Sequence, residues 1–203
     1  MDVDAVIRSY LGWEPDSERQ LIQTGLAGFC RMLELWLGTT DAPLADQPPF
    51  RSVAAVDRWN LAFGLVARAN PAAFLDEFEN HRSLSSGQKT SVAAILGTIE
   101  DPRACRLLSV LAADIDWIVR SNAMRALLRH DDERSRAAFE RGLNDQNMVV
   151  RLEALRGVSR SDPVRAAALY REFLTRPGLT PLMRQAANTA LHDISHGLPV
   201  ADH

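Results

Sequence analysis

Several features that mark specialised protein classes are scarce in this chain of 203 residues. No apolar run approaches the 18 or more residues of a membrane-spanning helix, because the richest segment, 61–69, contains Gly64 and Arg68. Charge of one sign does not dominate either, since 23 basic residues oppose 26 acidic ones. A general nucleic-acid binder usually has a clear basic excess. The composition therefore argues against a membrane protein and gives little support to a nucleic-acid binder.

Cysteine is also rare. Cys30 and Cys105 are far apart in the sequence and form no Cys-x-x-Cys pair, so we expect reduced, buried thiols. The first residues, MDVDAVIRSYLGWEPD, have two acids before the first base and no long apolar core, which is not the pattern of a secretory signal. These features predict a cytoplasmic protein. An apolar fraction of 46% is ample for a globular core.

The chain does contain an internal repeat of about 31 residues. Basic residues recur at intervals of 31, and finally 33, at Arg58, Lys89, Arg120, Arg151 and Arg184. Small or apolar residues follow each base three, six and seven positions later, which is the spacing of one buried stripe on an amphipathic helix. The last four bases are each preceded, four positions earlier, by a residue typical of helix N-caps: Ser85, Asp116, Asn147 and Thr180.

A break follows each of these helices and starts a second helix. The breaks include Asn70-Pro71, Asp101-Pro102 and Asp162-Pro163, and they predict second helices over 71–79, 102–113, 133–143 and 163–175. No segment has the alternating pattern of a half-buried strand. The predicted fold class is therefore all-α. A hairpin of two helices this short cannot bury its own apolar stripe, so we expect the hairpins to stack into an α-solenoid.

The repeat pattern resembles a known family. Residues 116–127 fit Asp-x-x-Val-Arg-x-x-Ala-x-x-Ala-Leu, and the segments Asp-Pro-Arg-Ala at 101–104 and Leu-Leu at 107–108 precede them. This pattern is similar to the short HEAT repeat of the phycobilisome-lyase-like type. The similarity covers about residues 53–194, with repeats at about 53–82, 84–113, 116–143, 147–175 and 180–194. We expect residues 51–203 to form one continuous domain. Repeats of this type serve many unrelated roles.

Residues 1–50 do not repeat, and we interpret them as a helical N-terminal cap on the stack. Helices are predicted over 2–11 and 17–37. The segment 38–50, GTTDAPLADQPPF, has three prolines and no periodicity. It is either a plain tether or an ordered arm that docks a partner or folds over the groove, and the sequence leaves both open.

The family resemblance implies that the helices bearing the repeated Val-Arg line a concave face. Helical geometry places positions one, five and eight after each base on that face. The partner-binding residues predicted in this way are Trp59, Phe63, Val66, Arg125, Leu128, Leu152 and Arg156, and the last repeat contributes Gln185 and Thr189.

Two groups of these residues suggest binding surfaces. Trp59, Phe63 and Val66 form a patch that could anchor a partner helix or peptide, unless the cap helix or residues 39–50 bury it. Arg125 and Arg156, with Arg129 and Arg160 beside them, form a strip that either binds an acidic peptide, a phosphate or a nucleic-acid backbone, or is a solvated face.

The five repeated bases are expected to be structural. In the family that this sequence resembles, the equivalent bases bond loops and acids between repeats, which implies this role for Arg58, Lys89, Arg120, Arg151 and Arg184. His192 and His196 lie one helical turn apart and are weak zinc-ligand candidates, but the zincin pattern has Glu where this chain has Asp193. We expect no metal, no cofactor and no catalytic constellation.

These features predict a non-catalytic scaffold that binds a partner protein or peptide on its concave face. Two alternatives stay open. One is a bilin-lyase-like accessory protein, which only the repeat type suggests. The other is a HEAT-like DNA-binding protein of the alkylpurine glycosylase type, which rests on the four arginines of the strip. The sequence identifies neither the partner nor the oligomeric state.

Overall fold

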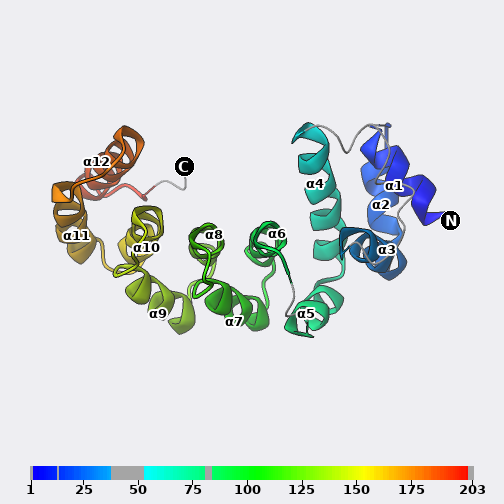
Figure 1. Cartoon of the computed structure of the whole chain (residues 1–203), viewed down its shortest axis with the longest axis horizontal. Helices are drawn as coiled ribbons and strands as arrows, with labels where there is room; N and C mark the ends of the chain where they lie inside the picture. Colours follow the sequence, from blue (N-terminus) through cyan, green and yellow to red (C-terminus); the bar gives the residue numbers. More distant parts are fainter. Residues whose placement is uncertain (1, 13, 38–52, 81–83, 201–203) are drawn as a thin grey trace. The chain divides into compact units, whose positions relative to one another are not determined.

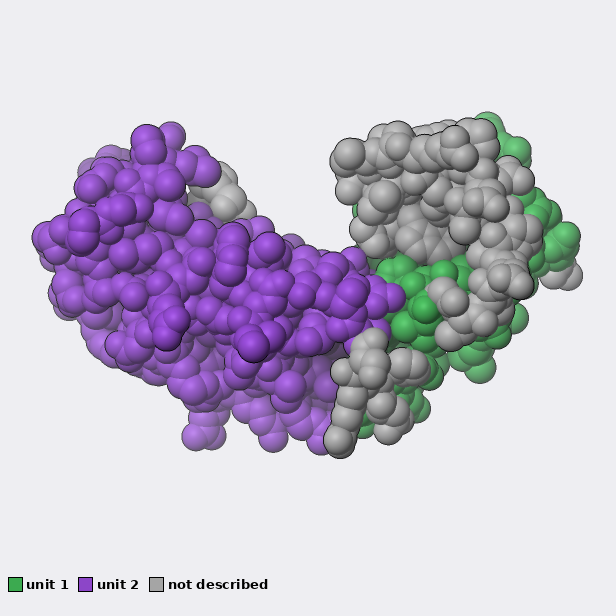
Figure 2. Space-filling view, in the orientation of Figure 1, with its two compact units in different colours: residues 1–83 green, residues 84–203 purple. Residues whose placement is uncertain are grey.

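The computed structural model describes residues 2–12, 14–37, 53–80 and 84–200, with the side chains of 53–60 and 80 left out. These residues form twelve helices and no strand, so the predicted all-α class is confirmed for them (Figure 1). They belong to two compact units, residues 1–83 and residues 84–203 (Figure 2). Within the described ranges, no helix combines the length and apolar character needed to cross a membrane.

The helices of unit 1 are arranged around α4. The described helices are α1 (Val3–Leu11), α2 (Ser17–Gln23), α3 (Gly25–Leu37), α4 (Val53–Ala69) and α5 (Pro71–Asn80). Helix α4 packs on each of the other four. The sequence predicted a single helix over 17–37, which is wrong: the backbone breaks before Gly25, whose φ of +59° is left-handed. The proline-rich segment 38–50 lies outside the described residues.

An aromatic cluster forms the core of unit 1. Phe63 of α4 stacks on Phe29 and Trp36 of α3, with ring centroids 6.1 and 5.0 Å away. Phe74 of α5 lies 6.0 Å from Phe63, and all three phenylalanines are buried. Because α4 shares this core with α3, the structure divides the chain after α5, whereas the sequence analysis placed the boundary near residue 50.

Unit 2 consists of helices that pack in a regular order. They are α6 (Ser86–Leu96), α7 (Pro102–Leu111), α8 (Trp117–Leu127), α9 (Glu133–Gly142), α10 (Met148–Ser161), α11 (Pro163–Thr175) and α12 (Pro181–Ser195). The even-numbered helices form a row in which α6 packs on α8, α8 on α10 and α10 on α12 (Figure 1). Each of α7, α9 and α11 packs on the helices before and after it.

Local capping explains where the helices of unit 2 begin. The side chains of the predicted N-caps each accept a hydrogen bond from a backbone N–H of the first turn of α6, α8, α10 or α12: Ser85, Asp116, Asn147 and Thr180. Asp101, Asp132 and Asp162 cap α7, α9 and α11 in the same way. The predicted N-caps are therefore confirmed.

The core of unit 2 includes the predicted stripe of small and apolar residues. The residues three positions after the bases are all buried in this unit: Val92, Ala123, Ala154 and Ala187. Small side chains at these positions let the helices approach closely. The packing is also tight at Gly157 of α10, where an added Cβ would lie 2.2 Å from the ring of Phe139 of α9.

Candidate functional site

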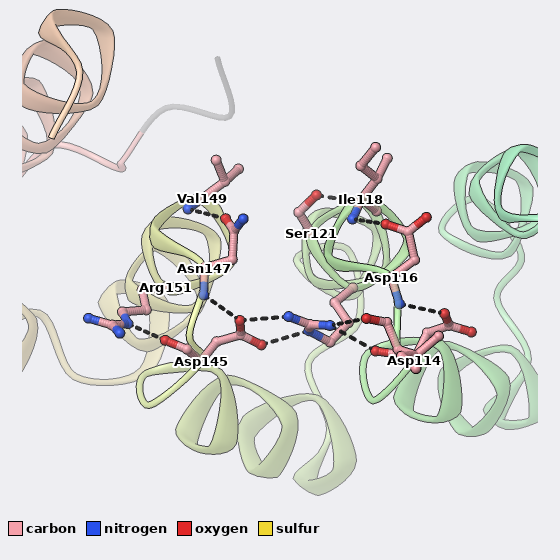
Figure 3. Close-up of polar contacts among 10 residues, drawn as sticks. Asp114, Asp116, Ile118, Ser121, Asp145, Asn147, Val149 and Arg151 are labelled. Carbon is pink, nitrogen blue, oxygen red and sulfur yellow. Dashed lines mark hydrogen bonds and ion pairs between the residues drawn. The ribbon is translucent and has the colours of Figure 1, made fainter. Parts of the chain in front are cut away.

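The repeated bases of unit 2 bond the loops between helices. Lys89 Nζ lies 2.6 Å from Asp114 Oδ2. Arg120 donates from Nε and Nη2 to the two carboxylate oxygens of Asp145, at 2.7 and 2.8 Å, and from Nη1 to the carbonyls of Asp114 and Ile115. Figure 3 shows the hydrogen bonds of Asp145 and Asp114 at the loops that precede α8 and α10. We call this set of bases and aspartates the ladder.

The electrostatics of the ladder follow from its geometry. Burial alone would raise the pKa of the Asp145 carboxyl, but hydrogen bonds from Arg120 and from the Asn147 backbone N–H outweigh it, so this pKa is lowered. The hydrogen bond to Asp145 in turn raises the pKa of Arg120. Contacts of this kind are what the family resemblance implies for these bases. Arg184 donates to the carbonyl of Leu174, and the side chain of Arg58 lies outside the described residues.

The predicted aromatic patch is not an exposed surface. Phe63 and Val66 are fully buried, and Phe63 is covered by Phe29 and Trp36 of the N-terminal helices. This corrects the expectation of an exposed patch and agrees with the alternative that the cap helix covers it. The side chain of Trp59 is not among those described.

Two further predicted partner-binding residues, Leu128 and Leu152, are buried as well. Leu128 follows α8 and is 3% exposed, so it offers almost no surface to a partner. Leu152 of α10 is 7% exposed, although it still lines a groove. Helical geometry alone placed both residues outward, but the neighbouring helices cover most of each side chain.

A groove of about 410 Å³ runs between α10 and α12. Three of the predicted partner-binding residues line it, namely Arg125, Leu152 and Arg156, and so do Gln185 and Thr189 of the last repeat. Its remaining lining is mostly apolar or small: Val149, Glu153, Thr180, Leu182, Met183, Ala186, Ala190, Asp193 and Val200. The structure therefore brings together the predicted positions of the last repeats.

A buried acid, Glu153, pairs with two of the four arginines of the predicted basic strip, Arg125 and Arg156. Its side chain is 3% exposed, and its Oε1 accepts a hydrogen bond from Arg125 Nη2 at 2.7 Å. Its Oε2 accepts one from Arg156 Nη1 at 3.0 Å. A buried carboxylate requires such partners. Arg125 and Arg156 are thus a bonded cluster across α8 and α10, and only Arg125 is largely exposed, with 56% of its side chain accessible.

An apolar row that the sequence patterns did not single out stands two residues before each of the last three bases. The row consists of Ile118, Val149 and Leu182. Ile118 and Leu182 are 45% and 74% exposed, and Val149 is half-buried. Ile118 and Val149 project to the same side of their helices (Figure 3). The available signal was an apolar residue two positions after the N-cap in three successive repeats. Glu153 stands two positions after Arg151 and was missed, because only positions one, five and eight after each base were assigned to the concave face.

The histidine pair has no third ligand among the described residues. The rings of His192 and His196 have centroids 4.1 Å apart, and His196 Nδ1 lies 2.8 Å from the carbonyl oxygen of His192. Within the part of the chain that the structure describes, no group of three or more His, Cys, Asp or Glu could hold a metal ion.

The two cysteines differ in their surroundings. Cys105 is buried, and its Sγ donates to Asp132 Oδ1 at 3.0 Å. Burial, together with this carboxylate, raises the pKa of the Cys105 thiol to about 12. Cys30 is exposed, so the expectation of two buried thiols is wrong for this residue.

Comparisons with protein-family models, with curated proteins and with solved structures find no match to this chain. The all-helical structure is compatible with a helical-repeat protein, because neighbouring helices of unit 2 pack in sequence order. Membership of the HEAT family stays a prediction from the sequence pattern.

Proposed function

We propose that unit 2 is an α-solenoid of HEAT-like hairpins, and that the protein is a non-catalytic interaction module. In this proposal a segment of a partner polypeptide binds in the groove between α10 and α12. The recurring caps, the buried stripe and the ladder support the repeat assignment, since each recurs at the repeat interval.

The observation that carries the proposal is the length of the groove. Its lining follows α12 from Thr180 to Asp193. At a rise of 1.5 Å per residue this is about 20 Å of helix. A groove that extends along two packed helices fits a helical or extended peptide segment better than a compact ligand.

The chemistry of the lining indicates what the partner presents. Leu182 and Met183 provide apolar surface along one side, while Ala186 and Ala190 are small enough to admit a side chain from outside. Burial of apolar side chains is the main favourable term in such recognition. Arg125 at the edge bonds Glu153 through Nε and Nη2, which leaves its Nη1 for a polar group of the partner. The expected ligand is therefore a segment with apolar anchors at helical or alternate spacing.

The two alternatives have less support. Salt-dependent binding to a nucleic-acid backbone needs several free cations. Of the four arginines of the strip, Arg125 and Arg156 already share Glu153, so the exposed Arg129 and Arg160 are the two that remain for this role. The bilin-lyase-like alternative still rests on the repeat type alone.

The proposal is tested by selecting peptides from a random displayed library on the immobilised full-length chain. Affinities of the selected peptides are then measured for wild type, Leu182→Glu and the control Val164→Glu. Leu182 is 74% exposed in the groove, and Val164 is 82% exposed on α11 and does not line it. We expect Leu182→Glu to weaken binding at least about tenfold, as for an interface anchor, and Val164→Glu to bind like wild type. Equal effects of both variants, or no selected peptide, would refute the proposal.

A further inference from the structure

The ladder lacks a carboxylate at its third position. Asp114 and Asp145 each lie 25 residues after the base that they pair with. Counting 25 residues from Arg151 leads to Arg176. The N-cap offers a second alignment, because Asp114 and Asp145 each stand two residues before the N-cap of the next helix. The residue two positions before the next N-cap, Thr180, is Gly178. By either alignment, the base Arg151 lacks the aspartate that Lys89 and Arg120 each have.

Arg151 forms no ion pair among the described residues, although its charge helps to lower the pKa of the nearby Asp145 carboxyl. Its Nε donates to the backbone carbonyl of Asp145, and its Nη1 lies 3.7 Å from Met148 Sδ. The carboxylate of Asp145 is already bonded by Nε and Nη2 of Arg120. Over the described ranges of the chain, no carboxylate forms an ion pair with the Arg151 guanidinium.

Arg151 lines a pocket of about 240 Å³ between α9, α10 and α11. Two glutamates also line it, but each has an arginine of its own. Arg165 Nη2 donates to Glu140 Oε2 at 2.8 Å, and Arg176 Nη2 donates to Glu172 Oε1 at 2.9 Å. The charged residues of the lining are thus three arginines and two glutamates, of which two arginines are paired with the two glutamates. The third arginine, Arg151, gives the lining a net positive charge.

Apart from the charged side chains and Asn144, the residues that line the pocket are apolar. Leu143, Leu155, Leu169 and Phe173 contribute to its lining. Its volume lies below the range of about 300–1,000 Å³ that is usual for drug-sized ligands. The pocket thus combines one unpaired guanidinium with an apolar wall in a space suited to a small molecule. An anion that also carries an apolar group matches both features.

We propose that this pocket binds a small organic carboxylate. Because Nε of Arg151 already donates to the Asp145 carbonyl, the carboxylate of the ligand bonds the Nη groups of Arg151, and its apolar part contacts the leucines and Phe173. The pocket shares no lining residue with the groove between α10 and α12, so this proposal does not depend on the proposed function.

The first test uses benzoate as the probe and its neutral analogue benzamide as the comparison. The Nε–Hε signal of Arg151 in the full-length chain is followed by NMR during titration at constant ionic strength. We expect a saturable shift with benzoate and none with benzamide. No saturable shift, or the same shift with both compounds, would overturn the proposal.

The second test restores the missing acid. Arg176→Asp places a carboxylate at the spacing of the first two ladder pairs, so it should occupy Arg151 and weaken benzoate binding at least about tenfold. Arg171→Asp makes the same charge change on α11 at an exposed residue that does not line the pocket, and it should bind like wild type. Arg151→Gln provides a second variant that should lose the saturable shift of neighbouring signals. Undiminished binding in Arg176→Asp and Arg151→Gln would contradict the assignment.

Discussion

At the scale of single residues, the burial of an ion pair decides what it contributes to stability. The side chains of Arg120 and Asp145 are only 17% and 13% exposed, whereas those of Arg165 and Glu140 are each 47% exposed. Removing one partner of a buried pair leaves the other charge uncompensated, while exposed pairs contribute little. We expect Arg120→Gln to lower the free energy of unfolding by about 2–4 kcal/mol, and Arg165→Gln by less than about 1 kcal/mol.

Urea unfolding at neutral pH measures both changes. The two arginines suit a matched comparison, because each makes a two-pronged bond to a carboxylate 25 residues away. Equal losses of stability would show that the ladder contact is no stronger than a surface ion pair.

The lowered pKa of Asp145 makes stability depend on pH. Folding lowers this pKa below its ordinary value of 3.8, so the stabilisation is fully present above that value and is lost as the pH falls through the lowered pKa. Wild type should therefore lose stability on acidification below about pH 4. Asp145→Asn should lose less over the same interval, although it is less stable at pH 7. Urea midpoints at pH 7, 4 and 3 measure this, and an equally steep loss in the variant would contradict it.

The two thiols should react at very different rates. Cys30 is exposed, whereas Cys105 is buried with a pKa of about 12 and stays protonated at neutral pH. A colorimetric thiol reagent should therefore modify one cysteine per native chain and two per unfolded chain. In Cys30→Ser the native reaction should disappear. Rapid labelling of native Cys30→Ser would show that Cys105 is accessible.

At the scale of helices, local chemistry made the helix starts predictable and left the buried faces uncertain. Asn147 and Thr180 could be identified as caps because a cap acts on the N–H groups of its own first turn. The break before Gly25 was missed, since a glycine inside an apolar pattern is compatible with a continuous helix. Leu128 and Leu152 were placed outward because helical spacing does not specify which neighbouring helix covers them.

Close helix packing predicts opposite effects for two glycine-to-alanine changes. Gly157→Ala would bring Cβ within 2.2 Å of the buried ring of Phe139, and this overpacking should cost about 1–3 kcal/mol of stability. Gly87 in the first turn of α6 has no atom within 4 Å of an added Cβ, so Gly87→Ala should raise stability by up to about 1 kcal/mol. Thermal and urea unfolding of both variants test this. A stabilised Gly157→Ala would mean that α9 and α10 pack less closely than described.

At the scale of the whole chain, the repeat interval predicted the order of helices but not the surroundings of α4. Phe63 is buried by Phe29 and Trp36, which lie in a non-repeating segment with no fixed register to the repeats. In unit 2, by contrast, Arg125, Leu152 and Arg156 could be assigned to one groove because successive repeats place equivalent positions side by side. Glu153 could not be foreseen, since its burial depends on two arginines that approach it from different helices.

The central claim is that a partner polypeptide lies in the groove between α10 and α12, and site-specific photo-crosslinking in the cells that naturally produce the protein tests it most directly. A benzophenone amino acid replaces Leu182 in the groove or, as the control, Val164 on α11. The account predicts a discrete adduct with a polypeptide from position 182, abolished by an excess of a selected groove-binding peptide, and no such adduct from position 164. Equal adducts from both positions, or none from position 182, would contradict it.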